Sequence, residues 1–447
     1  MSAVHNYLQR CHTLLFVIYA SSAAFMTYFC MYAFRKPFSV ATYQESGDIF
    51  GALDFKVAIV LAQVLGYMLS KFIGIKVVSE LPAARRAFML LSLVMLAQCA
   101  LMLFAVVPEP WKPLMMFANG IPLGMIWGIV FSFLEGRKTS EILGAFLSVT
   151  FIVASGLVRT VGQWLLTDLQ VTEYWMPAAT GALFIIPLFI SVYFLAQTPA
   201  PSASDKFARQ ARKPMTGKQR WQFFTQYAPG ILLLIFSFLL FTGLRDFRDN
   251  FSAEIWHALG YGEEPAIFTY AGIRIAGVVL VVLAAMVLVK DNRKAFLTNH
   301  GFICFGCLLL GATTFAFQQQ WIDGKSWMVW LGAGLYIAYI PYNCFLFDRM
   351  ISAVGSTANA GFLIYLADSA GYVGSVGMLL YRTFATPEIS WLQFFIFLCY
   401  FVACAGALLV ITSLIYFSFR LRQHNAKKTV DVVMQSNASH YSVNSNA

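Results

Sequence analysis

The sequence predicts an all-α integral membrane protein, with twelve transmembrane helices in two six-helix bundles related by a pseudo-two-fold axis. Three observations predict this fold class. Of the 447 residues, 59% are hydrophobic and only 12% are charged, whereas an ordinary soluble domain carries about twice that share of charge. Apolar runs long enough to cross a bilayer recur twelve times along the chain. One long polar segment divides these runs into six and six.

The predicted spans follow from the rule that each crossing needs roughly 20 apolar residues. The first six, which make 1–196 an N-terminal bundle, are predicted at 13–43, 55–79, 87–107, 112–135, 142–166 and 177–196. The second six, which make 228–418 a C-terminal bundle, are predicted at 228–255, 266–289, 298–318, 327–347, 358–381 and 391–418.

Two polar segments lie outside the predicted spans. The first, 197–227, is predicted to be a cytoplasmic linker, and the mixture of basic and aromatic residues at its end is typical of an interfacial helix. The second, 419–447, is predicted to be a disordered cytoplasmic tail.

The distribution of basic residues predicts the orientation of the chain. The net charge is +10 and the pI is about 9.2. With the N-terminus placed inside, 20 of the 31 Lys and Arg residues fall in inside segments and 8 fall in outside segments. Cytoplasmic loops carry such an excess. We therefore predict an inner-membrane protein with both termini cytoplasmic, and no nucleic-acid partner is needed to explain the basic pI.

The two halves share short sequence matches at nearly one spacing. The segment GIPLGMIWGIVFSFLEGRK (120–138) aligns with GAGLYIAYIPYNCFLFDRM (332–350) at an offset of 212. Arg35, late in the first span, falls near Arg245, late in the seventh, at an offset of 210. Transporters are often built from such repeats, with the substrate site at the repeat interface near the bilayer midplane. The repeat therefore predicts that Arg35 and Arg245 converge where the halves meet.

Charged residues within apolar spans mark a functional or pairing site, because each costs about 2.5–3.5 kcal/mol at the bilayer centre. The guanidinium groups of Arg35 and Arg245 suit bidentate binding of phosphate or carboxylate. The alternative for Arg35 is a side chain that snorkels to the interface at the end of its helix. Five embedded bases against one embedded acid, Asp368, favour an anionic ligand; the bases are Arg35, Lys71, Arg159, Arg245 and Arg274.

Four of these embedded residues have alternative interpretations. Lys71 either supports the site or snorkels to the cytoplasmic face. Arg159 and Arg274 either line the cavity or pair with a neighbouring acid during assembly. Asp368 either neutralises one of the bases or serves as a proton-coupling or gating group.

The sequence has no constellation typical of an enzyme. It lacks a nucleophile beside a base, a Gly-rich phosphate loop before a helix and a His pair at metal-ligand spacing. We therefore predict no enzymatic activity, no cofactor and no metal site.

Four short motifs resemble the major facilitator superfamily, and within it the organophosphate:phosphate antiporter branch. They are YAFRKPF (32–38), LSKFI (69–73), LRDF (244–247) and NAGF (359–362). The resemblance implies that Arg35 and Arg245 bind the phosphate group and that Lys71 supports the site.

The same resemblance implies a bridge between the halves, in which Lys36 pairs with Asp246 or Asp249. The chain departs from the branch in its fifth helix, where Ala154 replaces a histidine, and Arg159 and Arg274 are additions. A divergent sister family is therefore the alternative to membership of the branch itself.

Together these observations predict a monomeric secondary transporter of a small organic anion, such as phosphate or a phosphate ester. Alternating access would move the anion, by exchange as in an antiporter or by proton coupling. Two alternatives remain. One is an exporter of a cation, drug or other non-phosphate solute, against which the shortage of embedded acids argues. The other is a transporter-like sensor or scaffold that signals through its tail.

Overall fold

The structure is a computed structural model that describes residues 3–44, 46–47, 53–137, 139–202, 205, 217–262, 264–355, 360–386 and 388–444. The helices of its N-terminal half are α1 (Ala3–Arg10), α2 (Thr13–Tyr32), α3 (Phe55–Ser79), α4 (Arg86–Val106), α5 (Lys112–Leu123), α6 (Ile126–Leu134), α7 (Ser140–Thr167) and α8 (Met176–Ala196). Short 3-10 turns are η1 (Pro37–Val40), η2 (Ala83–Arg85) and η3 (Glu109–Trp111). The helices of its C-terminal half are α10 (Gly217–Asn250), α11 (Ser252–Ala258), α12 (Ile267–Val287), α13 (Asn292–Gln318), α14 (Gly324–Cys344), α15 (Leu346–Ala353), α16 (Ala360–Ala385) and α17 (Trp391–Asn444).

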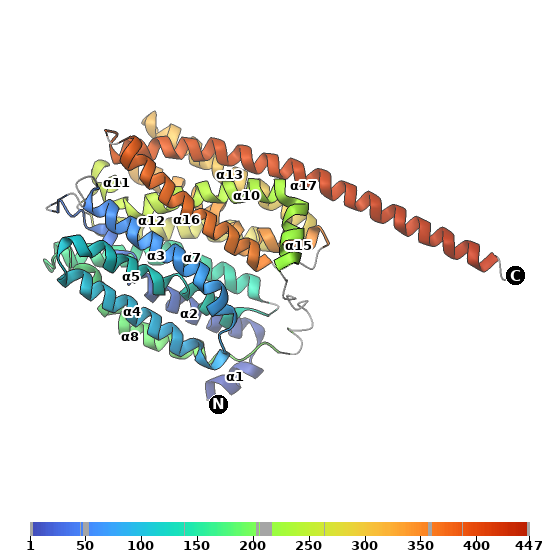
Figure 1. Cartoon of the computed structure of the whole chain (residues 1–447), viewed down its shortest axis with the longest axis horizontal. Helices are drawn as coiled ribbons and strands as arrows, with labels where there is room; N and C mark the ends of the chain where they lie inside the picture. Colours follow the sequence, from blue (N-terminus) through green and yellow to red (C-terminus); the bar gives the residue numbers. More distant parts are fainter. Residues whose placement is uncertain are drawn as a thin grey trace.

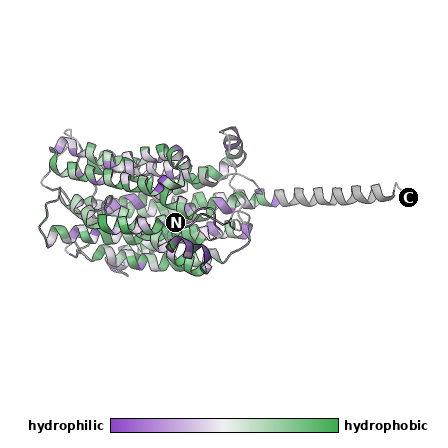
Figure 2. Ribbon diagram, turned by 90° about the horizontal axis from the view of Figure 1, so that it is seen from below, coloured by the Kyte–Doolittle hydropathy of each residue, from purple (hydrophilic) through white to green (hydrophobic). Residues whose placement is uncertain are grey.

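The predicted number of spans is confirmed. Among the described residues, eleven helices are long and apolar enough to cross a membrane, with α5 and α6 forming one span, and α14 and α15 form a twelfth that bends by 52°. The two sets of helices lie side by side in Figure 1, the N-terminal half in blue to green and the C-terminal half in yellow-green to red. Hydrophobic residues dominate the ribbons of both in Figure 2. Large apolar side chains such as Phe88 and Ile186 point outward, 74% and 72% exposed, as expected for a surface in contact with lipid.

The internal repeat reappears in the positions of the helices. The starts of α3 and α12 are 212 residues apart, as are the starts of α5 and α14. Asp54, Asp291 and Asp323 cap three helices by accepting a hydrogen bond from the backbone N–H three residues on, which fixes where α3, α13 and α14 begin. The shared spacing supports a duplicated six-helix unit.

The two halves meet along α3 against α16 and α7 against α12. We call the end of the bundle at which α3 begins the outer end, in keeping with the predicted orientation. A Cβ added at Gly156 of α7 would lie 2.6 Å from the carbonyl oxygen of Phe268, and one added at Gly272 of α12 would lie 3.2 Å from that of Ile152. The backbones of α7 and α12 are therefore in direct contact across the interface.

The end of the first span differs from the prediction. The span was predicted to continue to residue 43, but α2 ends at Tyr32 and the chain turns before η1 begins at Pro37. Pro37 has no backbone N–H with which to continue the helical hydrogen-bond ladder, so it disfavours extension of α2 through this position. Arg35 and Lys36 therefore lie in a turn and not within the helix.

Two helices are longer than predicted. α10 is continuous from Gly217, so the described part of the predicted interfacial segment belongs to the seventh span; residues 206–216 of the linker lie outside the described residues. α17 continues as a helix to Asn444 over much of the predicted disordered tail. No Gly or Pro lies between 419 and 444 to interrupt it.

Candidate functional site

Arg35 is a buried cation that lies on an aromatic ring. Its guanidinium carbon is 3.8 Å from the centre of the Tyr67 ring on α3, and the residue is 7% exposed. Its Nε is buried without a hydrogen-bond partner. Within the described part of the chain, no carboxylate lies within 4.0 Å of it. The burial of a cation without a carboxylate partner is costly.

Amide side chains hold the turn that carries Arg35. Gln63 Nε2 donates to the Arg35 carbonyl over 3.0 Å and to Asn119 Oδ1 over 2.8 Å. Asn119 Nδ2 donates in turn to the carbonyl of Phe34 over 3.1 Å. These bonds satisfy the backbone groups that the end of α2 leaves unpaired.

Arg245 on α10 is equally buried but has an acidic partner. Its Nη2 lies 2.7 Å from Oδ1 of Asp246. Its guanidinium lies 4.4 Å from the ring centre of Tyr339 on α14 and donates to the hydroxyl of that tyrosine. Ser375 of α16 donates to the other oxygen of Asp246 over 2.8 Å. The resemblance left Asp246 open as a partner of Lys36, but the carboxylate pairs with Arg245.

Two contacts between α3 and α16 join the halves near Arg35. The rings of Tyr67 and Tyr372 are 5.1 Å apart. One helical turn away, Lys71 Nζ lies 2.9 Å from Oδ2 of Asp368. Asp368 therefore neutralises one of the embedded bases. Tyr372 lies three residues from Ser375, the partner of Asp246, so a single turn of α16 connects the surroundings of Arg35 and Arg245.

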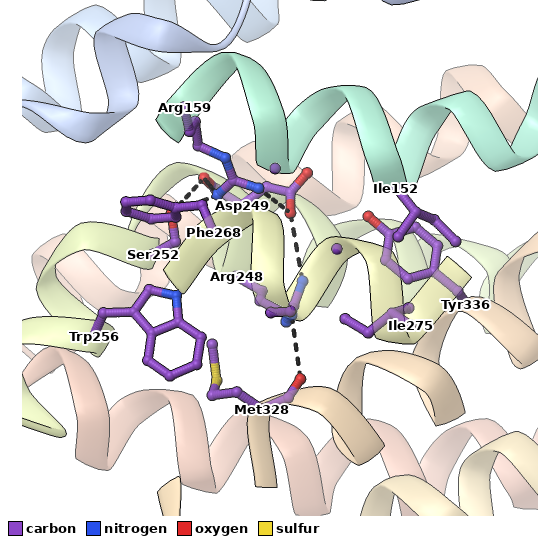
Figure 3. Close-up of a pocket in the computed structure, with 13 residues that line it drawn as sticks. Ile152, Arg159, Arg248, Asp249, Ser252, Trp256, Phe268, Ile275, Met328 and Tyr336 are labelled. Atoms are coloured by element: carbon purple, nitrogen blue, oxygen red, sulfur yellow. Dashed lines mark hydrogen bonds and ion pairs between the residues drawn. The ribbon is translucent and has the colours of Figure 1, made fainter. Parts of the chain in front are cut away.

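A second group of charges, which we call the outer cluster, consists of Lys36, Arg159, Arg248 and Asp249; the last three are labelled in Figure 3. Asp249 lies 3.6 Å from Lys36, 3.5 Å from Arg159 and 3.7 Å from Arg248. Lys36 also donates to Asn250 Oδ1 over 3.1 Å. Of the two carboxylates that the resemblance offered to Lys36, the structure therefore pairs it with Asp249.

The outer cluster ties the halves together, since Lys36 and Arg159 come from one half and Asp249 comes from the other. Arg159 on α7 also donates to the carbonyl of Asp249 over 3.0 Å and to the hydroxyl of Ser252 over 2.5 Å. Further toward the outer end, Lys56 forms an ion pair with Glu254 of the opposite half.

Arg274 lies apart from the other predicted site residues. It is on the exposed face of α12, with its guanidinium carbon 3.5 Å from the ring centre of Tyr270. Whether Arg274 lines the cavity or pairs with an acid during assembly therefore stays a prediction. α12 is apolar on every side, so the sequence alone gives no indication of which face points inward.

The count of embedded charges also changes. Asp246 and Asp249 are each 4% exposed, so they join the partly buried Asp368 as acids within the bundle. Arg248, 7% exposed, was missed as a site residue. The repeated Arg-Asp pairs in RDFRDN (245–250), three residues apart, place Arg245 and Arg248 about one helical turn apart and were the available signal.

Cations and carboxylates are matched one to one at three places in the interface, but they are not matched in the outer cluster or at Arg35. The one-to-one pairs are Lys56–Glu254, Lys71–Asp368 and Arg245–Asp246. The outer cluster has three cations for Asp249, and Arg35 has no carboxylate partner among the described residues. In the same described part, no three His, Cys, Asp or Glu side chains gather as a metal-ligand set. The interface therefore carries a positive excess that suits an anion.

A family model matches residues 37–420 and describes a family of unknown function, DUF5690. The chain belongs to this family. No curated protein matches its sequence.

Several solved structures share the fold of this DUF5690 chain. A major facilitator superfamily proton:xylose symporter aligns with a TM-score of 0.58 at 16% identity, over 90% of this chain and 95% of the other. The nucleoside transporter NupG aligns with a TM-score of 0.58 at 13% identity, over 90% and 98%. A peptide transporter, POT, solved in complex with sulfate, aligns with a TM-score of 0.58 at 14% identity, over 91% and 95%. The fold is therefore that of the major facilitator superfamily. Membership of the organophosphate:phosphate antiporter branch stays a prediction.

In this DUF5690 chain, the buried charges lie where the two halves touch. The outer cluster and the Lys71–Asp368 pair each join one half to the other. Any motion that separates the halves at either place has to break an ion pair. A charged ligand that binds at either place would therefore change how strongly the two halves are held together.

Proposed function

We propose that this protein is a secondary transporter that carries a small organic anion between its two halves by alternating access. The fold supports a transport role, because its structural neighbours carry names of sugar, nucleoside and peptide transporters. The observation that carries the choice of an anion is the buried guanidinium of Arg35, which lies over Tyr67 without a carboxylate partner among the described residues.

The proposed anion would bind first to Arg35 and then to Arg245. At Arg35 it supplies a missing counter-charge. At Arg245 it has to compete with Asp246 for the guanidinium. Because the two arginines belong to opposite halves, an anion that contacts both draws the halves together. Phosphate and phosphate esters fit this role, since their oxygens accept paired hydrogen bonds from a guanidinium group.

Lys71 takes a supporting role in this proposal. Its ammonium group is held by Asp368, so it becomes available to the anion only when that ion pair opens. Protonation of Asp368 removes the charge that holds Lys71, which offers a route to proton coupling. Exchange of one anion for another requires no such protonation, so the two modes differ in their dependence on a proton gradient.

The test is uptake of radiolabelled phosphate by proteoliposomes that contain the purified protein, loaded with phosphate or with a panel of phosphate esters. Wild type is compared with Arg35→Gln, Arg245→Gln and the control Arg274→Gln, which removes an arginine on the exposed face of α12. We expect saturable uptake that the first two variants lose and the control retains.

Wild-type uptake in the Arg35→Gln/Arg245→Gln variant would overturn the site assignment. Absence of uptake for phosphate, phosphate esters and carboxylates, with and without an imposed proton gradient, would overturn anion transport and favour the sensor alternative.

A further inference from the structure

Three residues of the outer cluster, Arg159, Arg248 and Asp249, line a small cavity. Its volume is about 20 Å³, and a cavity of about 10–15 Å³ holds one water molecule. The walls come from both halves, with Arg159 of α7 on one side and Arg248 and Asp249 of α10 on the other. Figure 3 shows these three side chains gathered on one side of the cavity, with Trp256 and Met328 on the other.

The charges around this cavity do not cancel. Lys36, Arg159 and Arg248 share the single carboxylate of Asp249, so the cluster carries two uncompensated positive charges. The three nitrogen–oxygen distances of 3.5–3.7 Å exceed the 2.7–3.2 Å of a good hydrogen bond. Asp249 therefore makes no close ion pair with any of the three, and a second anion would lower the cost of burying them.

Arg248 points to where that anion would bind. The residue is 7% exposed and lines the cavity, and its Nε is buried without a hydrogen-bond partner. Its Nη2 donates to the carbonyl of Met328 over 3.2 Å, which holds the guanidinium in place. An unpartnered charged donor at a cavity wall requires an acceptor.

A wider space leads from the outer end to this cavity. The second space has a volume of about 190 Å³, and its walls include Gln163, Glu173 and His257. Two residues, Trp256 and Phe268, line both the cavity and this wider space. These two aromatic side chains therefore stand between the wider space and the cavity.

From this geometry we propose that the outer cluster binds a single halide ion, chloride under ordinary salt conditions, in contact with Arg159 and Arg248. Chloride is a single spherical ion somewhat larger than a water molecule, whereas the four oxygens of phosphate do not fit into about 20 Å³. The ion joins a cation of one half to a cation of the other, so it stabilises the contact between the halves at the outer cluster. The site is separate from Arg35, and the proposal does not depend on which anion the protein transports.

The test measures the thermal unfolding of the purified protein in sodium chloride, sodium bromide and sodium gluconate at one ionic strength. We expect chloride and bromide to raise the Tm with a saturable concentration dependence, whereas gluconate is too large for the cavity and does not. Arg248→Gln should lose the response to halide, and Arg274→Gln should keep it. Arg35→Gln should also keep it, which separates a failure of this proposal from a failure of anion transport.

A direct measurement on the wild-type protein avoids reliance on how well Arg248→Gln folds. Crystals grown in bromide should show an anomalous scattering peak between Arg159 and Arg248. Equal Tm values in chloride and gluconate, an undiminished halide response in Arg248→Gln, or a bromide-soaked crystal with no peak in this cavity would overturn the proposal.

Discussion

Arg35 and Arg245 occupy matching places in the two halves, but their surroundings differ. Each lies over a tyrosine ring and each is buried. Arg245 has a carboxylate 2.7 Å away, on the next residue of the chain, whereas Arg35 is followed by a lysine that points to the outer cluster. The duplicated unit therefore retains the position of the arginine but not the charge beside it.

Because of this difference, we expect the two halves to hold an anion in different ways. The half that carries Arg35 offers a charge with no competitor among the described residues, so binding there gains the full interaction. The half that carries Arg245 offers a charge already satisfied by Asp246, so binding there exchanges one partner for another. Affinity should therefore come mainly from Arg35, and Arg245 should respond to the anion by releasing Asp246.

The largest expected effect on stability is that of Arg245→Gln. Among the described residues it leaves Asp246 buried with Ser375 as its hydrogen-bond partner, and loss of one member of a buried ion pair costs about 3–5 kcal/mol. The free energy of unfolding in detergent measures this loss. The matched double variant, Arg245→Gln/Asp246→Asn, removes the stranded charge and should recover most of it. A single variant as stable as wild type would mean that the two arginines do not differ in this way.

A smaller loss is expected for Lys71→Gln, which strands Asp368. The side chain of Asp368 is 14% exposed, so water offsets part of the cost, and about 1–3 kcal/mol remains. Addition of Asp368→Asn should restore stability in the same unfolding assay. If the double variant is no more stable than Lys71→Gln, the ion pair between α3 and α16 does not contribute as described.

Arg35→Gln should change the free energy of unfolding by no more than about 1 kcal/mol. The loss of the cation–π contact with Tyr67, worth about 0.5–2 kcal/mol, is offset by the removal of an unpaired buried charge. Uptake of the transported anion should nevertheless fall by at least about tenfold, which corresponds to roughly 1.4 kcal/mol of binding free energy. A large loss of stability with normal uptake would reverse the contrast between the two arginines.

The smallest effect is expected for Arg274→Gln, which changes an exposed residue away from the interface. Substitutions of this kind alter the free energy of unfolding by less than about 0.5 kcal/mol. Both uptake and the Tm should match wild type. A marked loss of uptake would instead support a place for Arg274 in the site.

Much of the fold could be predicted from the sequence, because apolar length alone identifies a transmembrane helix. The residue at which α2 ends could not be predicted from the sequence, because apolar residues continue past Pro37 and the turn before it has no polar signature. The continuation of α17 to Asn444 could not be inferred from composition either. A polar sequence without Gly or Pro is compatible with both a helix and a disordered tail.

The candidate site could be predicted in part. Arg35, Lys71 and Arg245 stood out as charges in apolar surroundings, and all three are buried at the interface. The sequence could not assign their partners, because Lys71 and Asp368 are 297 residues apart and only the packing of α3 on α16 joins them. In a helix that is apolar all round, the neighbours of a lone arginine do not indicate which face it lies on, so the sequence left the role of Arg274 open.

Gly156 sets a limit on how closely the two halves approach each other. At this position α7 contacts the backbone of α12 without an intervening side chain. A larger side chain here would therefore push the two helices, and with them the two halves, apart. A relative with alanine or valine at the corresponding position would need a wider gap along the whole seam, and its outer ion pairs would have to reach further. The spacing between the two halves in this family is therefore expected to scale with the size of this one residue.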